Sequence, residues 1–152
     1  MRILDRNEAL ASLDAVRQTD QKMAGRMTWP LWRHAAFGAI EALFVLGWGL
    51  PSPAMAACIV IAIAGMSWIY HDDRKRYGMF VSGASSRAAR PAIWLAFAVV
   101  IAGLGAILLT GGLNQWTPWV PVIVGSVFVL ETLASLWWQK LAQADLRNPD
   151  DA

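Results

Sequence analysis

The chain has 152 residues, of which 57% are hydrophobic and only 16% are charged, and its formal net charge is +2. This composition departs from that of soluble globular domains toward that of membrane proteins, and no nucleic-acid partner is expected. The single cysteine, Cys58, excludes a disulfide framework and a cysteine-based metal site.

The amino-terminal segment, residues 1–28, contains acids and no apolar core of signal-peptide length, so a cleaved secretory signal is not expected. Asp5 is a candidate N-cap, and apolar residues follow at approximately helical spacing. These are Leu10, Leu13, Val16, Met23 and Met27. We expect a cytoplasmic amphipathic helix, which could pack beneath the membrane domain, lie along the headgroups or pair with a partner.

Four apolar stretches follow, at about residues 31–50, 53–70, 91–110 and 118–138. A helix that rises roughly 1.5 Å per residue needs about 20 residues to cross a hydrocarbon core of roughly 30 Å. The sequence therefore predicts an all-α fold, an integral membrane four-helix transmembrane bundle over residues 29–139. Residues 140–152 are expected to form a short cytoplasmic tail.

Basic residues lie before the first stretch, between the second and third, and after the fourth, whereas the other two connections carry no charge. Lys and Arg are retained on the cytoplasmic side, so both termini are expected in the cytoplasm of a multi-pass inner (plasma) membrane protein of bacteria. Arg33 is expected to extend its guanidinium to the interface. The candidate contacts with anionic membrane lipids are Arg33, Arg74, Lys75, Arg76, Arg87 and Arg90.

Small residues recur at helical spacing within three of the apolar stretches. In lipid, helices associate through close contact at such residues. They are Gly38 and Ala42 in the first stretch, Ala54, Cys58 and Ala62 in the second, and Ala98, Ala102 and Ala106 with Gly103 and Gly105 in the third. They could serve packing within the bundle or the seam of a homo-oligomer, and internal packing is the expected use.

Two acids, Glu41 and Glu131, lie inside the first and fourth stretches at similar depths. An intramembrane carboxylate is costly unless it is protonated, paired or hydrated, so such residues are candidates for function. The pair could share a proton or a cation, with Trp48 on the face of Glu41 as a cation–π wall. Alternatively each acid is protonated and fixes helix register through a neighbouring hydroxyl. The candidate hydroxyls are Ser67, Ser126 and Ser135.

His34 lies seven residues before Glu41, hence on the same helical face, and could relay protons to it or contact a headgroup. His71, Asp72 and Asp73 could bind a divalent ion, but no second set of ligands accompanies them, so neither a metal nor another cofactor is expected. The nucleotide-binding and hydrolase motifs are absent, and an enzyme is not expected.

The charged amino-terminal helix, the PLWRH entry to the first stretch and the RYGMFVSG segment after the second resemble small uncharacterised four-span proteins of bacterial inner membranes. That resemblance implies a fold and no activity. Four spans with a first-helix glutamate also resemble small multidrug transporters, which lack the long amino-terminal segment and the basic central loop.

The sequence favours a non-enzymatic membrane protein that acts through association with itself or with another membrane component. The alternative is a small proton-coupled transporter or cationic-ligand pocket centred on Glu41 and Glu131. The two hypotheses differ in geometry, because a transporter requires the two carboxyl groups to share one site.

Overall fold

The computed structural model describes residues 10–12, 14–15, 28–77 and 87–147. The long helices are α2 (Leu31–Trp48), α3 (Ser52–Tyr77), α4 (Arg90–Leu109) and α5 (Trp119–Arg147). No strand occurs in these ranges, so the all-helical prediction is confirmed for the part of the chain that they cover. Residues 10–12, 14 and 15 are helical, but most of 1–28 lies outside the described residues, and the amphipathic helix expected there stays a prediction.

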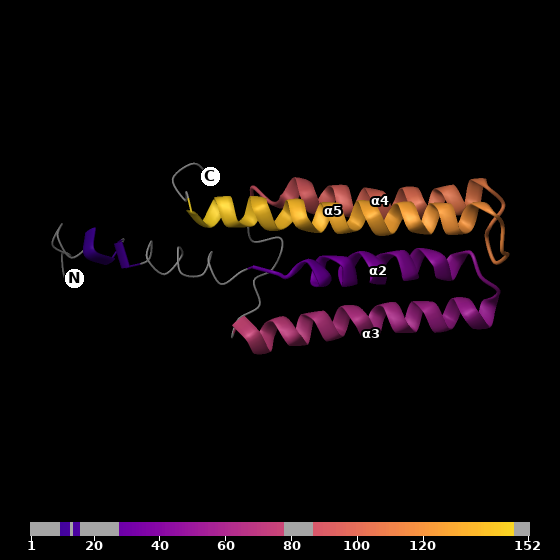
Figure 1. Cartoon of the computed structure of the whole chain (residues 1–152), viewed down its shortest axis with the longest axis horizontal. Helices are drawn as coiled ribbons and strands as arrows, with labels where there is room; N and C mark the ends of the chain where they lie inside the picture. The colour runs from indigo at the N-terminus through magenta and orange to yellow at the C-terminus, as the bar shows by residue number, and fades with distance from the viewer. Residues whose placement is uncertain (1–9, 13, 16–27, 78–86, 148–152) are drawn as a thin grey trace, which may run out of the picture.

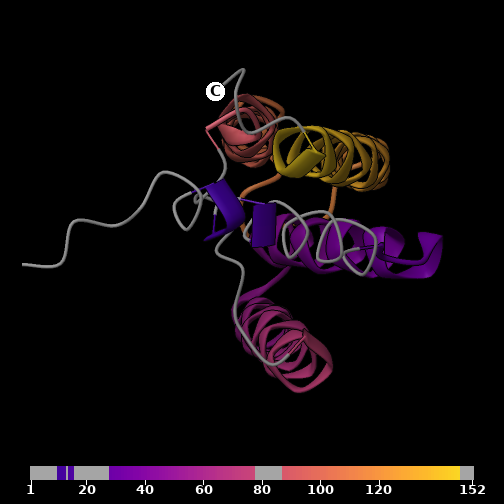
Figure 2. The ribbon, with the colours of Figure 1, turned by 90° about the vertical axis from the view of Figure 1, so that its left-hand side faces the viewer.

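The four helices lie side by side along one axis, and consecutive helices run in opposite directions (Figure 1). Seen along that axis, α2 lies between α3 on one side and the pair α4 and α5 on the other (Figure 2). Helix α2 packs most extensively against α5 and then against α3, whereas α3 packs chiefly against α2. The arrangement is therefore a group of three mutually packed helices, α2, α4 and α5, with α3 on the outer side of α2.

Three helices are long and apolar enough to cross a membrane: α3 over Ser52–Lys75, α4 over its whole length and α5 over Trp119–Asp145. Helix α2 does not reach the same hydropathy, because its 18 residues include Arg33, His34 and Glu41. Its neighbours cover these polar side chains with protein, which is where intramembrane polar residues are normally found. The structure thus gives three membrane-capable helices, and the fourth crossing stays a prediction.

Prolines and a loop contact set the ends of the helices. Pro30 precedes α2 in an extended conformation, and Pro91 occupies the first turn of α4, where its missing N–H costs nothing. Helix α4 is followed by Gly111, whose φ of 70° favours glycine. The backbone N–H of Asn114 then donates to the carbonyl of Trp48 at 2.9 Å, which ties the α4–α5 connection to the end of α2.

Glycines allow the helices to approach closely. A Cβ on Gly38 would lie 2.7 Å from the carbonyl oxygen of Phe128, so α2 and α5 could not pack this tightly around a larger residue. On α4, a Cβ on Gly103 would lie 2.7 Å from a methyl group of Val127. The buried apolar cluster beside these contacts consists of Ala42, Val45, Ile107 and Val127.

The small residues of α4 do not all pack inside. Gly38 and Ala42 of α2 and Ala62 of α3 are buried, as internal packing requires, whereas Cys58 is half-buried and Ala54 is exposed. On α4, however, Ala98 and Ala102 are exposed, and a Cβ on Gly105 would meet nothing within 4 Å. The expectation of internal packing is wrong for Ala98 and Ala102, because α4 turns the side that carries Gly103 toward α5; Ala106 is half-buried.

Candidate functional site

Arg33, in the first turn of α2, is buried and neutralised within the protein. Its side chain is 1% exposed. One guanidinium nitrogen lies 3.1 Å from Asp72 Oδ2, and the other donates to Asp73 Oδ1 at 2.6 Å. The guanidinium carbon also lies 4.9 Å from the centre of the Trp29 ring, a cation–π distance. These contacts join the beginning of α2 to the end of α3.

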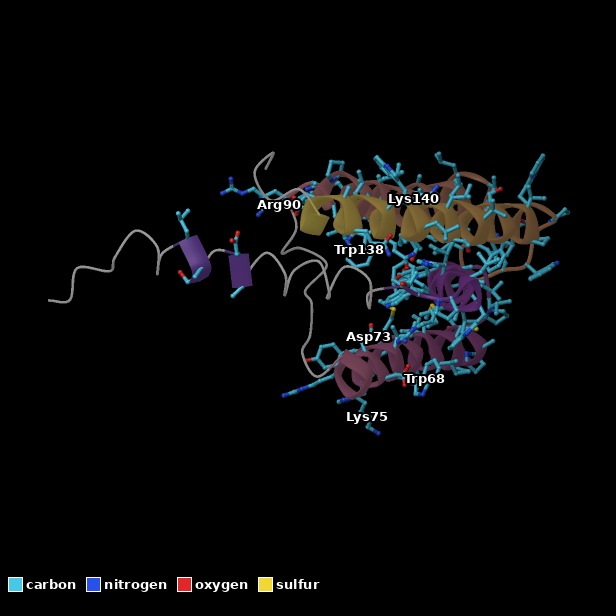
Figure 3. All side chains as sticks on the ribbon, turned by 60° about the vertical axis from the view of Figure 1, so that its left-hand side comes forward. Trp68, Asp73, Lys75, Arg90, Trp138 and Lys140 are labelled. Atoms are coloured by element: carbon cyan, nitrogen blue, oxygen red, sulfur yellow. The ribbon has the colours of Figure 1, made fainter. Side chains whose placement is uncertain are left out.

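The expectation that Arg33 reaches the interface as a headgroup contact is wrong. Helix α3 continues past Tyr70, where the apolar stretch ends, to Tyr77. The extra turns supply Asp73 on the side of α3 that faces α2, while Lys75 points away (Figure 3). The guanidinium is therefore paired with two carboxylates of the same chain.

The other candidate lipid contacts remain available to headgroups. The side chains of Arg74, Lys75, Arg87 and Arg90 are exposed. The side chain of Arg76 lies outside the described residues. Contact of these residues with anionic lipid stays a prediction.

His34 lies buried between α2 and α5, with no exposed surface. Its Nδ1 is 2.8 Å from Ser135 Oγ, and its Nε2 is 3.1 Å from Gln139 Oε1. The same Gln139 oxygen accepts the backbone N–H of Trp29 at 2.7 Å. The Trp29 ring covers this end, with its centroid 5.5 Å from that of His34 and 6.2 Å from that of Trp138. His34 is therefore an interhelical residue, and the expectation of a headgroup contact is not met.

Glu131 is the least satisfied polar residue of the site. Its side chain has no exposed surface, and within the described structure neither carboxyl oxygen has a hydrogen-bond partner. It lies one helical turn before Ser135 on α5. Glu41, on α2, is half-buried and close enough to Glu131 for the two charges to repel. The two acids are thus within electrostatic range of each other, on two helices that pack together.

The hydroxyls that could have fixed these acids are used elsewhere. Ser67 and Ser126 each donate at 2.9 Å to a carbonyl four residues earlier on their own helix, a common arrangement for serine in helices. Ser135 is bonded to His34. Among the described hydrogen bonds, none joins a serine to Glu41 or Glu131, so the structure gives no support to a serine–carboxyl lock.

Trp48 lies at the other end of α2. It is seven residues after Glu41, which corresponds to roughly 10 Å along the helix. Its backbone carbonyl accepts the Asn114 N–H, and its indole nitrogen is buried without a hydrogen-bond partner among the described residues. Trp48 therefore lies near the α4–α5 connection and away from the carboxyl pair.

The residues considered as metal ligands are occupied by other contacts. Asp72 and Asp73 pair with Arg33, and the ring of His71 packs edge-on against Tyr70 with centroids 5.4 Å apart. Over the described ranges, no three His, Cys, Asp or Glu side chains gather as a metal site requires.

The sequence did not predict that Ser135 and Gln139 would be partners of His34, or that Asp72 and Asp73 would be partners of Arg33. One sequence pattern did point to the polar partners on α5. Glu131, Ser135 and Gln139 recur every fourth residue, a spacing that places three polar groups on one stripe of an otherwise apolar helix.

Comparison of the chain with protein-family models, with curated proteins and with solved structures found no match.

Proposed function

We propose that this chain is a four-span protein of the bacterial inner membrane and that Glu41 and Glu131 form the proton- or cation-binding site of a small proton-coupled transporter. One observation carries the proposal. Glu131 is fully buried, and both of its carboxyl oxygens lack a hydrogen-bond partner within the described structure. An ionised carboxylate in such surroundings is strongly unfavourable, so the site calls for a proton or a bound cation.

The neighbouring charges support a shared ion. Two carboxyl groups that repel one another are not both ionised without a countercharge. Arg33 is the nearest buried cation on α2, and Asp72 and Asp73 already neutralise it. A single proton or a monovalent cation is then the simplest countercharge for the pair.

The same ion pairs support α2 as a fourth membrane crossing. Arg33 contributes no net charge once it is bound to the aspartates, and neighbouring helices cover the polar side of α2. The exposed basic residues at the end of α3 and the beginning of α4 favour the cytoplasm for this end of the molecule, and hence for both termini.

The test is proton release on cation binding. Detergent-solubilised protein in unbuffered solution is titrated with tetraphenylphosphonium and, separately, with sodium. We expect one of the two cations to displace protons, and we expect Glu131→Gln to abolish and Glu41→Gln to reduce the release. The exposed carboxylate variant Asp14→Asn is the matched control and should behave as wild type. Absence of release with either cation, or full release from Glu131→Gln, would overturn the proposal.

A second candidate function, self-association, is favoured by the exposed stripe on α4. Ala98 and Ala102 are exposed and Gly105 has open space above it, which is the surface that a second copy of the helix needs for close approach in lipid. We expect Ala102→Phe to lower energy transfer between labelled copies in bilayers at least severalfold. Ala57→Phe, at an exposed position of α3, is the control and should leave transfer unchanged. Equal transfer in the two variants would refute this candidate.

A further inference from the structure

We propose that His34 relays protons between the Arg33 end of the molecule and Glu131, with the Ser135 hydroxyl as the intermediate carrier. The inference rests on the proposed function, because it needs Glu131 to gain and lose a proton. The imidazole is buried and bonded to Ser135 on one side and to Gln139 on the other, and Ser135 lies one helical turn after Glu131, whose carboxyl oxygens lack a hydrogen-bond partner within the described structure.

The hydrogen bonds fix the resting form of the histidine. Gln139 Oε1 accepts the backbone N–H of Trp29, so the atom that faces His34 Nε2 is an oxygen and can only accept. In the neutral ring Nε2 therefore carries the hydrogen, and Nδ1 is an acceptor. The Ser135 hydroxyl then donates to Nδ1. It differs in this from Ser126 and Thr132, whose hydroxyls donate to carbonyls of their own helix.

The relay alternates between the two neutral forms of the ring. In the outward step Glu131 gives its proton to Ser135 Oγ, the Ser135 hydroxyl proton passes to Nδ1, and Nε2–H leaves toward Gln139, so the ring keeps its hydrogen on Nδ1. In the inward step Nε2 takes up a proton, Nδ1–H passes to Ser135 Oγ, and the hydroxyl proton passes to the Glu131 carboxylate. Residues four apart on a helix are neighbours, with Cβ atoms about 5–6 Å apart, so this carboxylate is the acceptor one turn away. The inward step restores the resting form, and its net change is one proton taken up at Nε2 and one delivered to Glu131.

The side chains around His34 leave a polar route to the surface at the Arg33 end of the bundle. Around His34 lie Arg33, which is held by Asp72 and Asp73, and the rings of Trp29 and Trp138. Trp29 and Gln139 are half-buried, so the polar chain approaches the surface there. Beyond the acids, toward the other end, the buried cluster of Ala42, Val45, Ile107 and Val127 offers no polar side chain. The described polar chain to Glu131 therefore begins at the Arg33 end.

The experiment follows Glu131 itself in protein reconstituted into nanodiscs. Infrared spectra record the C=O band of protonated carboxyl groups after a rapid pH jump, and the loss of a band in Glu131→Gln assigns it. We expect His34→Asn, which keeps an acceptor near Ser135 but cannot carry a proton, to slow the band's response at least about tenfold, since positioned acid–base groups typically contribute a hundredfold or more. Ser135→Ala should slow it similarly, and His71→Asn, at an exposed histidine, should not.

Chemical rescue separates a relay from a purely structural role. Imidazole added to His34→Ala should restore the rate, whereas pyrazole, a ring of the same size that does not protonate near neutral pH, should not. A wild-type rate in His34→Asn with the Glu131 band intact would overturn the relay and leave the proposed function standing. Absence of any band that Glu131→Gln removes would overturn both.

Discussion

The ion pairs of Arg33 lead to the sharpest stability prediction. Arg33→Met keeps most of the apolar stem and removes the charge, which takes the guanidinium away from Asp72 and Asp73 at the end of α3. The converse change, Asp72→Asn with Asp73→Asn, leaves a guanidinium that is 1% exposed without a countercharge. Combining all three substitutions removes every charge from the cluster.

The expected changes in the free energy of unfolding follow from how deeply each charged group is buried. Loss of one partner from a buried ion pair costs about 3–5 kcal/mol in free energy of unfolding. The two aspartates keep 21% and 15% of their side-chain surface, so water can partly solvate them, and Arg33→Met should cost about 2–4 kcal/mol. The Asp72→Asn, Asp73→Asn double variant should lose about 4–5 kcal/mol, at the upper end of this range, because the charge left without a countercharge is that of the buried Arg33. The triple variant should recover most of the loss, to within about 1–2 kcal/mol of wild type, because buried ion pairs are often replaceable by neutral groups.

The assay is unfolding by sodium dodecyl sulfate in mixed micelles, followed by helical circular dichroism. Arg74→Met, at an exposed arginine of the same helix end, is the matched control and should change the free energy of unfolding by less than about 0.5 kcal/mol. If the triple variant were less stable than both of its parents, or if Arg33→Met matched Arg74→Met, the assignment of α3 docking to these ion pairs would be wrong.

Three further predictions concern helix contacts and the buried acid. Gly38→Val should destabilise the protein by at least about 2 kcal/mol in the same assay, because the added Cβ meets the backbone carbonyl of Phe128, and a wild-type midpoint would contradict the α2–α5 contact. Gly105→Ala should be neutral or stabilising by up to about 1 kcal/mol, since nothing opposes its Cβ; a clear loss of stability would show a hidden contact there. Glu131→Leu should raise the free energy of unfolding by about 1–3 kcal/mol while abolishing proton release, because it removes an unsatisfied buried group; a fall in stability would indicate an undetected partner.

The sequence predicted the helices well and their ends less well. Hydropathy located all four apolar stretches, and prolines marked their beginnings at α2 and α4. Two helices extend beyond the apolar stretches: α3 continues from residue 70 to Tyr77, and α5 from residue 138 to Arg147. Hydropathy falls where a helix leaves the apolar region, but a polar sequence without glycine or proline can continue the helix into water.

By itself, then, the sequence determined that the chain is helical and that it carries acids and a histidine at positions where apolar residues dominate. Period and spacing also placed His34 on the face of Glu41. Which helix that face would meet was decided by the tertiary structure, which brought Ser135 and Gln139 to His34 and the two aspartates to Arg33. It also left Ala98 and Ala102 of α4 exposed. The physical reason is that helical periodicity defines the faces of a single helix, whereas neighbours far apart in the chain are chosen by close packing and charge pairing between helices.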